Sequence, residues 1–219
     1  MSENRDFSWL TDRIGRAEYS SRGLFDLIGP AAAEETSRDH EEQAAFAELV
    51  GTSGAGVVCE PTQVARVKRS GGGPVIALIG WPTGRHHSLI KAAEARLAVD
   101  DGADEVWVAV DAATLSAGES GDSGVNAVLA DIIAVSQVVE EPTRFGISCP
   151  ASVGKEALRA LADAVGKVGV DVVAVDVDKR GVSELPSVTC ALAVHGSIDS
   201  LDAAADLLLA GAYRVFPAS

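Results

Sequence analysis

The segment from Pro74 to Asp111 constrains the fold more than any other part of the chain. It begins with the apolar run Pro74–Ile79 (PVIALI), continues through Gly80–Gly84 (GWPTG) and an alanine-rich amphipathic stretch, and ends in a second apolar run, Val106–Val110. Two strands joined by a helix of this length form a parallel, right-handed βαβ unit. Because both strands are apolar almost throughout, the sheet is expected to be covered on both faces.

The same alternation of strand and helix continues along the chain. Strands are expected at 23–28, 54–59, 74–79, 106–110, 144–149, 170–177, 188–194 and 213–216. Helices are expected at 34–50, 62–69, 86–101, 125–139, 155–168 and 201–209. This order predicts an α/β fold, a (β/α)8 TIM barrel, as a single domain over 1–219, with 1–21 as a short N-terminal helical extension. An open doubly wound sheet is the alternative, which the strand count and the lack of a GxGxxG turn disfavour.

Composition narrows the classes of partner. The formal net charge of −14 argues against binding to nucleic acid or to anionic membrane surfaces. No apolar stretch is long enough to cross a bilayer, and the polar N-terminus lacks the order of a signal peptide, so a cytoplasmic location is expected. Cys59, Cys149 and Cys190 are isolated in apolar runs and are expected to be free thiols.

The central segment resembles the deoxyribose-phosphate aldolase family. That family carries an IGFPxG loop after its third strand and GADEV at its fourth, and the matching text here is Ile79–Gly84 (IGWPTG) and Gly102–Val106 (GADEV). Between them lies Lys91–Ala95 (KAAEA), and weaker matches follow in the family's order at 57–61, 131–135 and 198–212. The resemblance covers about residues 54–219. It implies a class I aldolase barrel, here shortened at its C-terminal end because the final barrel helix has no counterpart, and it implies Schiff-base chemistry on a lysine without a cofactor.

The positions that carry this chemistry in the family hold other residues here. By the resemblance, the Schiff-base lysine becomes Ala174, the second lysine becomes Ala193, and the catalytic aspartate becomes Trp107. A Schiff base cannot form on alanine, so we examined the five lysines for a substitute. Lys91, Lys155 and Lys167 are expected on solvated helix surfaces and Lys68 at the wrong end of the barrel. Lys179 alone follows a strand at the end where barrel active sites form.

Side-chain alternation, counted from the positions that the resemblance places inside the barrel, predicts an acidic barrel mouth. The candidate catalytic residues are Lys179, Asp111, Asp176 and His195, and the candidate binding residues are Glu60, Trp107, Arg85, Gly196 and Ser197. Such a mouth suits a cation, a metal or an amine better than a sugar phosphate. An alternative remains open, in which the strand-end aspartates cap the helices that follow them and Trp107 only fills the pocket.

The sequence therefore predicts a deoxyribose-phosphate aldolase-like protein that has lost Schiff-base activity and acts by binding. The predicted partner is a small or cationic ligand at the mouth, another protein, or a second copy of the chain. Two enzyme alternatives remain: an active lyase that cleaves 2-deoxyribose 5-phosphate or does related aldol chemistry, and a metal-assisted enzyme that uses the acidic mouth.

Overall fold

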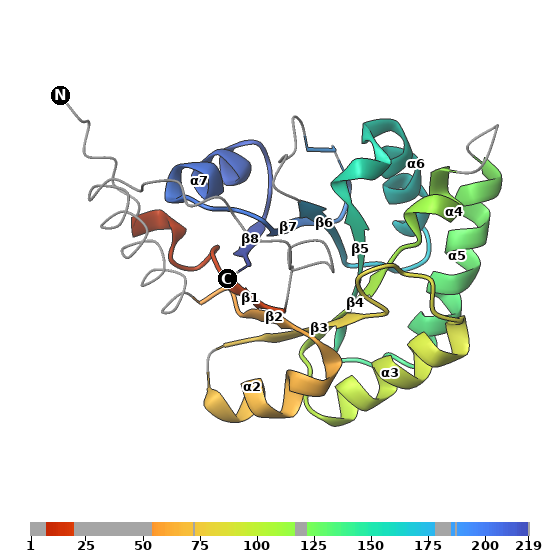
Figure 1. Ribbon diagram of the computed structural model, residues 1–219, viewed down its shortest axis with the longest axis horizontal. Helices are drawn as coiled ribbons and strands as arrows, with labels where there is room; N and C mark the ends of the chain where they lie inside the picture. Colours follow the sequence, from red (N-terminus) through yellow and green to blue (C-terminus); the bar gives the residue numbers. More distant parts are fainter. Residues whose placement is uncertain are drawn as a thin grey trace, which may run out of the picture.

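The eight strands of the protein form one sheet in which every neighbouring pair is parallel and the spatial order is the order of the chain (Figure 1). This computed structural model describes residues 8–19, 54–71, 73–116, 122–177, 185–186 and 188–218. The strands are β1 (Arg16–Glu18), β2 (Val57–Cys59), β3 (Val75–Ile79), β4 (Glu105–Ala109), β5 (Arg144–Pro150), β6 (Val172–Val177), β7 (Ala191–Gly196) and β8 (Arg214–Pro217). Parallel bridges from Ile14 to Val215 and from Ala17 to Ala218 join the first and last strands. The sheet is thus a nearly closed barrel, and the predicted (β/α)8 class is confirmed.

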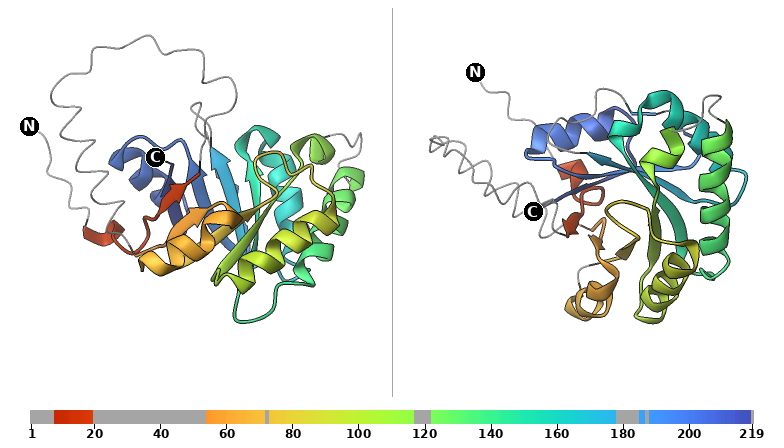
Figure 2. Two further views of the ribbon diagram at one scale, coloured as in Figure 1. Left: turned by 60° about the horizontal axis from the view of Figure 1, so that its bottom comes forward. Right: turned by 45° about the vertical axis from the view of Figure 1, so that its right-hand side comes forward.

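The helices lie outside the sheet and follow the strands in alternation (Figure 2). They are α2 (Val64–Ser70), α3 (Ser88–Asp100), α4 (Ala112–Ser116), α5 (Asp122–Ser136), α6 (Lys155–Val165) and α7 (Leu201–Leu209), with short 3-10 turns η1 (Ser8–Leu10), η3 (Pro61–Gln63) and η4 (Ala151–Val153). Within the described ranges, no helix has the length and apolar character needed to span a membrane.

The N-terminal part of the barrel differs from the sequence prediction. The first strand was expected at 23–28 and residues 1–21 were expected to be helical, but the structure places β1 at Arg16–Glu18. The predicted strand at 23–28 and helix at 34–50 lie outside the described residues. The strand went unrecognised because β1 has only three residues, two of them charged, and so lacks an apolar run.

The buried side chains form two layers, one on each side of the sheet. The outer layer fills the space between strands and helices. The inner layer fills the barrel itself and contains Ala17, Tyr19, Ala55, Val58, Ile76, Leu78, Trp107, Val172, Ala174, Ala193 and Phe216. A barrel of this size has a packed interior, so a substrate can enter only where that layer leaves room.

A buried ionic network occupies the N-terminal end of the barrel. The Glu105 carboxylate, 3% exposed, accepts hydrogen bonds from Arg214 Nη2 at 2.7 Å, from Trp107 Nε1 at 3.2 Å and from Arg144 Nη1 at 3.3 Å. These contacts tie β4, β5 and β8 together at the end opposite the expected active site. Buried charges are retained only when they are paired in this way.

The loop after β3 is held from outside by two side chains of α3. Gly80 has φ of 67°, and a Cβ there would lie 3.0 Å from Lys91 Cε. The Glu94 carboxylate accepts the Gly80 amide at 2.7 Å, and Lys91 Nζ donates to Asp131 Oδ2 at 2.5 Å and to the Ala109 carbonyl at 3.1 Å. The predicted solvated position of Lys91 is therefore wrong, because its side chain is 1% exposed and joins α3, β4 and α5.

Candidate functional site

The three positions that depart from the aldolase pattern meet inside the barrel. Trp107 and Ala174 are fully buried and Ala193 is 1% exposed. The Trp107 ring lies edge-on to Phe216 with centroids 5.5 Å apart, and its centroid is 5.9 Å from that of His195. Gly146 on the neighbouring strand provides the space, since a Cβ there would lie 2.6 Å from Trp107 Cδ1. The indole thus occupies the barrel interior as part of its packing.

His195 is the centre of a buried polar cluster above Trp107. Its Nδ1 shares a hydrogen bond with the Tyr19 hydroxyl, and its Nε2 shares one with Ser148 Oγ at 2.7 Å. The imidazole is fully buried, and Tyr19 and Ser148 are 5% and 2% exposed. Two hydroxyls from β5 and the segment after β1 therefore hold one imidazole from β7 in a fixed orientation.

Burial determines the protonation of this cluster. It lowers the pKa of His195, although the nearby Asp176 carboxylate acts in the opposite direction. Burial, and then the charge of Asp176, raise the pKa of Tyr19 well above its usual value. Both groups are accordingly neutral near pH 7. A neutral imidazole between two hydroxyls offers no positive charge to an anionic ligand.

Asp176 lies at the solvent side of this cluster. One of its oxygens, Oδ1, is 3.7 Å from His195 Nδ1, and the other accepts the Trp81 indole N–H at 3.3 Å. The Asp176 side chain is 26% exposed, and the Trp81 ring packs against Tyr19 with centroids 4.6 Å apart. A carboxylate and two aromatic rings therefore lie together at the C-terminal end of the barrel.

Asp111 and Arg85 do not join this cluster. Asp111 accepts hydrogen bonds from the Ala113 amide at 3.0 Å and from Thr114 Oγ1 at 2.8 Å, both in α4, and pairs with Arg85 Nε at 3.3 Å. Burial opposes ionisation of Asp111, but the bonds from Thr114, Ala113 and Arg85 outweigh it and hold its pKa below the usual value. The alternative in which a strand-end aspartate caps the following helix describes Asp111, because its carboxylate binds the start of α4, and its catalytic role stays a prediction.

Glu60 is also separate from the cluster. It precedes η3, makes no side-chain capping bond there, and is exposed. Its predicted position facing the mouth continued the inward alternation of Val58, but the chain leaves the strand at Cys59. Within the described residues, no group of three or more His, Cys, Asp or Glu side chains gathers as a metal site would require.

Gly196 and Ser197 form a tight turn after β7. The Ser197 amide donates to the Val177 carbonyl at 2.8 Å, and the Ile198 amide donates to the Gly196 carbonyl at 2.9 Å. A Cβ at Gly196 would lie 2.2 Å from the Val177 oxygen, so the two strand ends are in close contact here. The Ser197 and Ile198 amides thus both donate hydrogen bonds within the protein.

Lys179, the candidate catalytic lysine, lies outside the residues that the structure describes. The three cysteines are free, and burial raises the pKa of Cys59 and of Cys149 to about 12, so neither is a thiolate near neutral pH.

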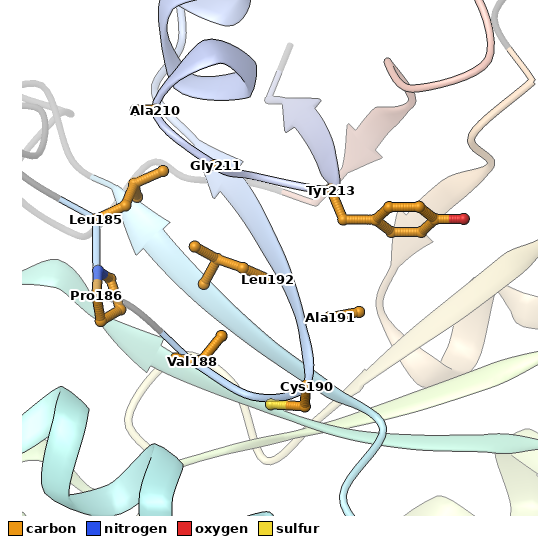
Figure 3. A pocket seen from close by; sticks show the side chains of 9 residues that line it. All are labelled: Leu185, Pro186, Val188, Cys190, Ala191, Leu192, Ala210, Gly211 and Tyr213. Carbon is orange, nitrogen blue, oxygen red and sulfur yellow. The ribbon is translucent and has the colours of Figure 1, made fainter.

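A cavity of about 330 Å³ lies near the N-terminal ends of β7 and β8 (Figure 3). Its walls come from the connection before β7, the start of β7 and the turn after α7, and include Leu185, Pro186, Val188, Leu192 and Tyr213. Of the predicted site residues that the structure describes, none lines this cavity.

Sequence reasoning missed Tyr19, Ser148 and Trp81. Ser148 alternates with Phe145, Ile147 and Cys149 in β5, so its inward direction was readable from the strand pattern. Tyr19 was hidden by the missed first strand. Trp81 was noted as part of the IGWPTG match, but nothing in the sequence indicated that its indole reaches Asp176.

Strand order, helix placement and a polar cluster at the carboxyl ends of the strands define a (β/α)8 barrel protein with its candidate site in the usual place for that class. No family model matches the sequence. The chain is 31% identical over 212 residues to the deoxyribose-phosphate aldolase of Nocardia farcinica, covering 91% of this chain and 90% of that protein. It is 32% identical over 163 residues to the enzyme of Corynebacterium glutamicum, covering 72% and 68%. The chain belongs to the deoxyribose-phosphate aldolase family.

Solved structures agree with this fold. A putative deoxyribose-phosphate aldolase from Toxoplasma gondii superposes with a TM-score of 0.65 at 16% identity, over 95% of this chain and 88% of that one. The deoxyribose phosphate aldolase of Aeropyrum pernix gives a TM-score of 0.56 at 18% identity, over 96% and 86%. At these identities the likeness concerns the architecture.

Proposed function

We propose that this family member forms no Schiff base at the family's positions and binds a small cationic ligand at the C-terminal end of its barrel. The observation that carries the first part is the complete burial of Trp107 beside Ala174 and Ala193. A Schiff base needs a neutral lysine amine facing a pocket that holds the carbonyl substrate. Instead, an indole occupies the space and methyl groups stand at both lysine positions.

The described lysines support the same conclusion. Lys68, Lys155 and Lys167 are exposed, and Lys91 donates outward to Asp131. Lys68 in addition pairs with Asp104 at 2.7 Å near the N-terminal ends of the strands. None of these four amines enters the barrel.

The phosphate of a sugar phosphate also finds little to bind among the described residues of the mouth. Phosphate sites use free backbone amides or cationic side chains. The Ser197 and Ile198 amides are already bonded to carbonyls, His195 is neutral, and Arg85 pairs with Asp111. This argues against deoxyribose phosphate as the ligand.

A cation fits the exposed part of the cluster better. Asp176 supplies a partly exposed carboxylate, and Trp81 places a half-buried aromatic ring beside it. An ammonium group over an aromatic face gains about 0.5–2 kcal/mol, and the carboxylate adds a charge-assisted hydrogen bond. The ligand class that we propose is therefore a small amine.

Borohydride trapping tests the loss of Schiff-base chemistry. The protein is incubated with 2-deoxyribose 5-phosphate and sodium borohydride and its intact mass is measured, with a family aldolase that retains its lysines as the positive control. We expect no covalent adduct on this chain under conditions that label the control stoichiometrically. A stoichiometric adduct, mapped to Lys179 or to any other lysine, would overturn the proposal.

Calorimetric titration with methylammonium and tetramethylammonium tests the ligand class. We expect binding that Asp176→Asn weakens and that Asp163→Asn, an exposed aspartate on α6, leaves unchanged. Equal affinities in both variants, or no binding to the parent protein, would contradict an amine site at Asp176.

Retained lyase activity is the second candidate, and the identity to the Nocardia farcinica enzyme over 91% of the chain favours it. Cleavage of 2-deoxyribose 5-phosphate that disappears in Lys179→Met and persists in Lys167→Met would establish it. The same two variants separate a specific lysine from adventitious amine reactivity.

A further inference from the structure

The carboxylate of Asp176 faces a buried side chain and the solvent at once. Its Oδ1 lies 3.7 Å from His195 Nδ1, and its Oδ2 accepts the Trp81 indole N–H at 3.3 Å. The Asp176 side chain is 26% exposed, whereas the imidazole is fully buried. One carboxylate therefore serves both as the neighbour of a buried histidine and as the exposed charge at which the amine of the proposed function would bind.

The hydrogen bonds of His195 suit both its neutral and its protonated form. Its Nδ1 is bonded to the Tyr19 hydroxyl and its Nε2 to the Ser148 hydroxyl. A hydroxyl can either donate or accept a hydrogen bond, while a protonated imidazole donates from both nitrogens. Protonation therefore requires only that the two hydroxyls reorient, and the imidazole keeps both of its partners.

Among the described residues around His195, Asp176 supplies the only charge. The side chains that surround the imidazole come from five neighbouring strands or the segments after them: Tyr19 after β1, Trp107 on β4, Ser148 on β5, Asp176 on β6 and Phe216, its register partner, on β8. Tyr19 is the other titratable group, and its pKa is raised well above the usual value by burial and then by Asp176, so it stays neutral below pH 7. Since a buried charge needs a partner of opposite sign, a protonated His195 depends on Asp176.

We propose that a cation bound at Asp176 and a proton on His195 exclude one another, so that ligand binding expels a proton and acidification expels the ligand. This inference rests on the proposed amine site and adds its regulation. A bound ammonium group neutralises the carboxylate charge that a protonated imidazole would need at 3.7 Å. Because coupling between two binding equilibria is reciprocal, the proton must weaken the ligand by the same factor as the ligand weakens the proton.

The direction of the pH effect follows from the environment of His195. Burial lowers the pKa of the imidazole below the ordinary value of 6.5, and the charge of Asp176 opposes this shift in part. A cation on Asp176 removes the opposing contribution, so the pKa of His195 falls further when the ligand is bound. Affinity is therefore full above pH 6.5 and decreases as the pH falls below it, by at most about tenfold per pH unit for one coupled proton.

Calorimetric titration with methylammonium and tetramethylammonium from about pH 7.5 to about pH 5 tests the coupling, since neither cation titrates in that range. We expect a constant affinity at the upper end and a decreasing one at the lower end. Titrations in two buffers of different ionisation enthalpy count the protons released, which should rise from about zero at the upper end toward at most about one per ligand. His195→Gln should bind without releasing protons, and His86→Gln, at an exposed histidine, is the matched control and should behave like the parent.

The outcomes separate this inference from the function on which it rests. If the parent protein binds neither cation at any pH, the amine site is wrong and the coupling with it. Binding that does not change with pH, or a pH dependence and proton release that persist in His195→Gln, would overturn the coupling alone. Circular dichroism shows whether His195→Gln folds. If it does not, NMR titration of the His195 imidazole in the parent protein decides, because saturating methylammonium should lower its pKa and an unchanged pKa would contradict the proposal.

Discussion

The outer and inner sides of strands β3 and β4 differ in what they keep of the aldolase pattern. Outside, Glu94 accepts a hydrogen bond from the Gly80 amide and the Lys91 side chain packs against Gly80. The Lys91 amine in turn donates a hydrogen bond to Asp131. Inside, Trp107, at the position that the resemblance matches to the family's aspartate, is fully buried and packs on Phe216. The matched residues on the outer side thus shape the loop and support the helix. The contrast between the two sides is that polar contacts organise the outer one and aromatic packing organises the inner one.

The largest expected effect comes from the inner side. Trp107→Ala removes a fully buried indole that packs on Phe216 and His195, and the cavity left behind should lower the free energy of unfolding by about 3–5 kcal/mol. Urea denaturation followed by far-UV circular dichroism measures this change. A loss below about 1 kcal/mol would mean that Trp107 is not part of the packing.

Gly146→Ala sharpens this test. In the parent protein the added methyl would press on the indole, with its Cβ 2.6 Å from Trp107 Cδ1, and should destabilise the fold. In the Trp107→Ala background part of that cost should vanish, because the clash with the indole is removed while the 2.9 Å approach to the Val172 carbonyl remains. Additive effects of the two substitutions would contradict direct contact between them.

The outer side predicts the next largest effect. Lys91→Met removes the cation from Asp131 and the donor from the Ala109 carbonyl, and should cost roughly 3 kcal/mol because a partly buried carboxylate is left unpaired. Lys167→Met, at an exposed lysine, should change stability by less than about 0.5 kcal/mol. Equal shifts in the urea midpoint for the two variants would show that the buried hydrogen bonds of Lys91 do not stabilise the fold.

The His195 cluster predicts a pH dependence of stability. Because burial lowers the pKa of His195, the unfolded chain binds a proton more readily than the folded one once the pH falls below the ordinary histidine value of 6.5. Stability should therefore decrease as pH falls through this window, by at most about 1.4 kcal/mol per pH unit. Urea midpoints measured from pH 7.5 to 5.5, at about half-unit steps, should show this slope in the parent and a flatter one in His195→Gln.

The smallest effect is expected at the hydroxyl partner. Ser148→Ala removes one hydrogen bond to His195 and should cost about 1 kcal/mol. Thermal unfolding detects a change of this size. Stabilisation by the substitution would show that the imidazole does not need this partner.

The barrel class and seven of its strands were predictable because their apolar runs have the length and spacing of parallel strands. The helix at 201–209 was placed at the bounds observed for α7. The first strand was not predictable, because Arg16–Glu18 pairs through its backbone and has little apolar sequence of its own.

The site was predictable in part. The resemblance correctly placed Trp107, Ala174 and Ala193 inside the barrel, because the direction of a side chain in a matched strand follows from the shared fold. Alternation could not decide the direction of Asp111 and Glu60, because β4 ends at Ala109 and β2 ends at Cys59, before either residue. The burial of Lys91 could not be inferred from its helix alone. The two groups that accept hydrogen bonds from its amine lie on β4 and α5.

The junction between β1 and β8 has a consequence for how the chain reaches this fold. Within the described residues, two isolated bridges and the Arg13 side chain, which donates to the Tyr213 carbonyl at 3.0 Å, connect segments from opposite ends of the sequence. Such contacts carry a high loop-closure entropy and form late in folding. Until they form, β1 to β8 make an open sheet whose edge strands can pair with other molecules. Refolding yield should therefore decrease as protein concentration rises, because strand edges that are not yet paired at the β1–β8 junction can form sheets between molecules.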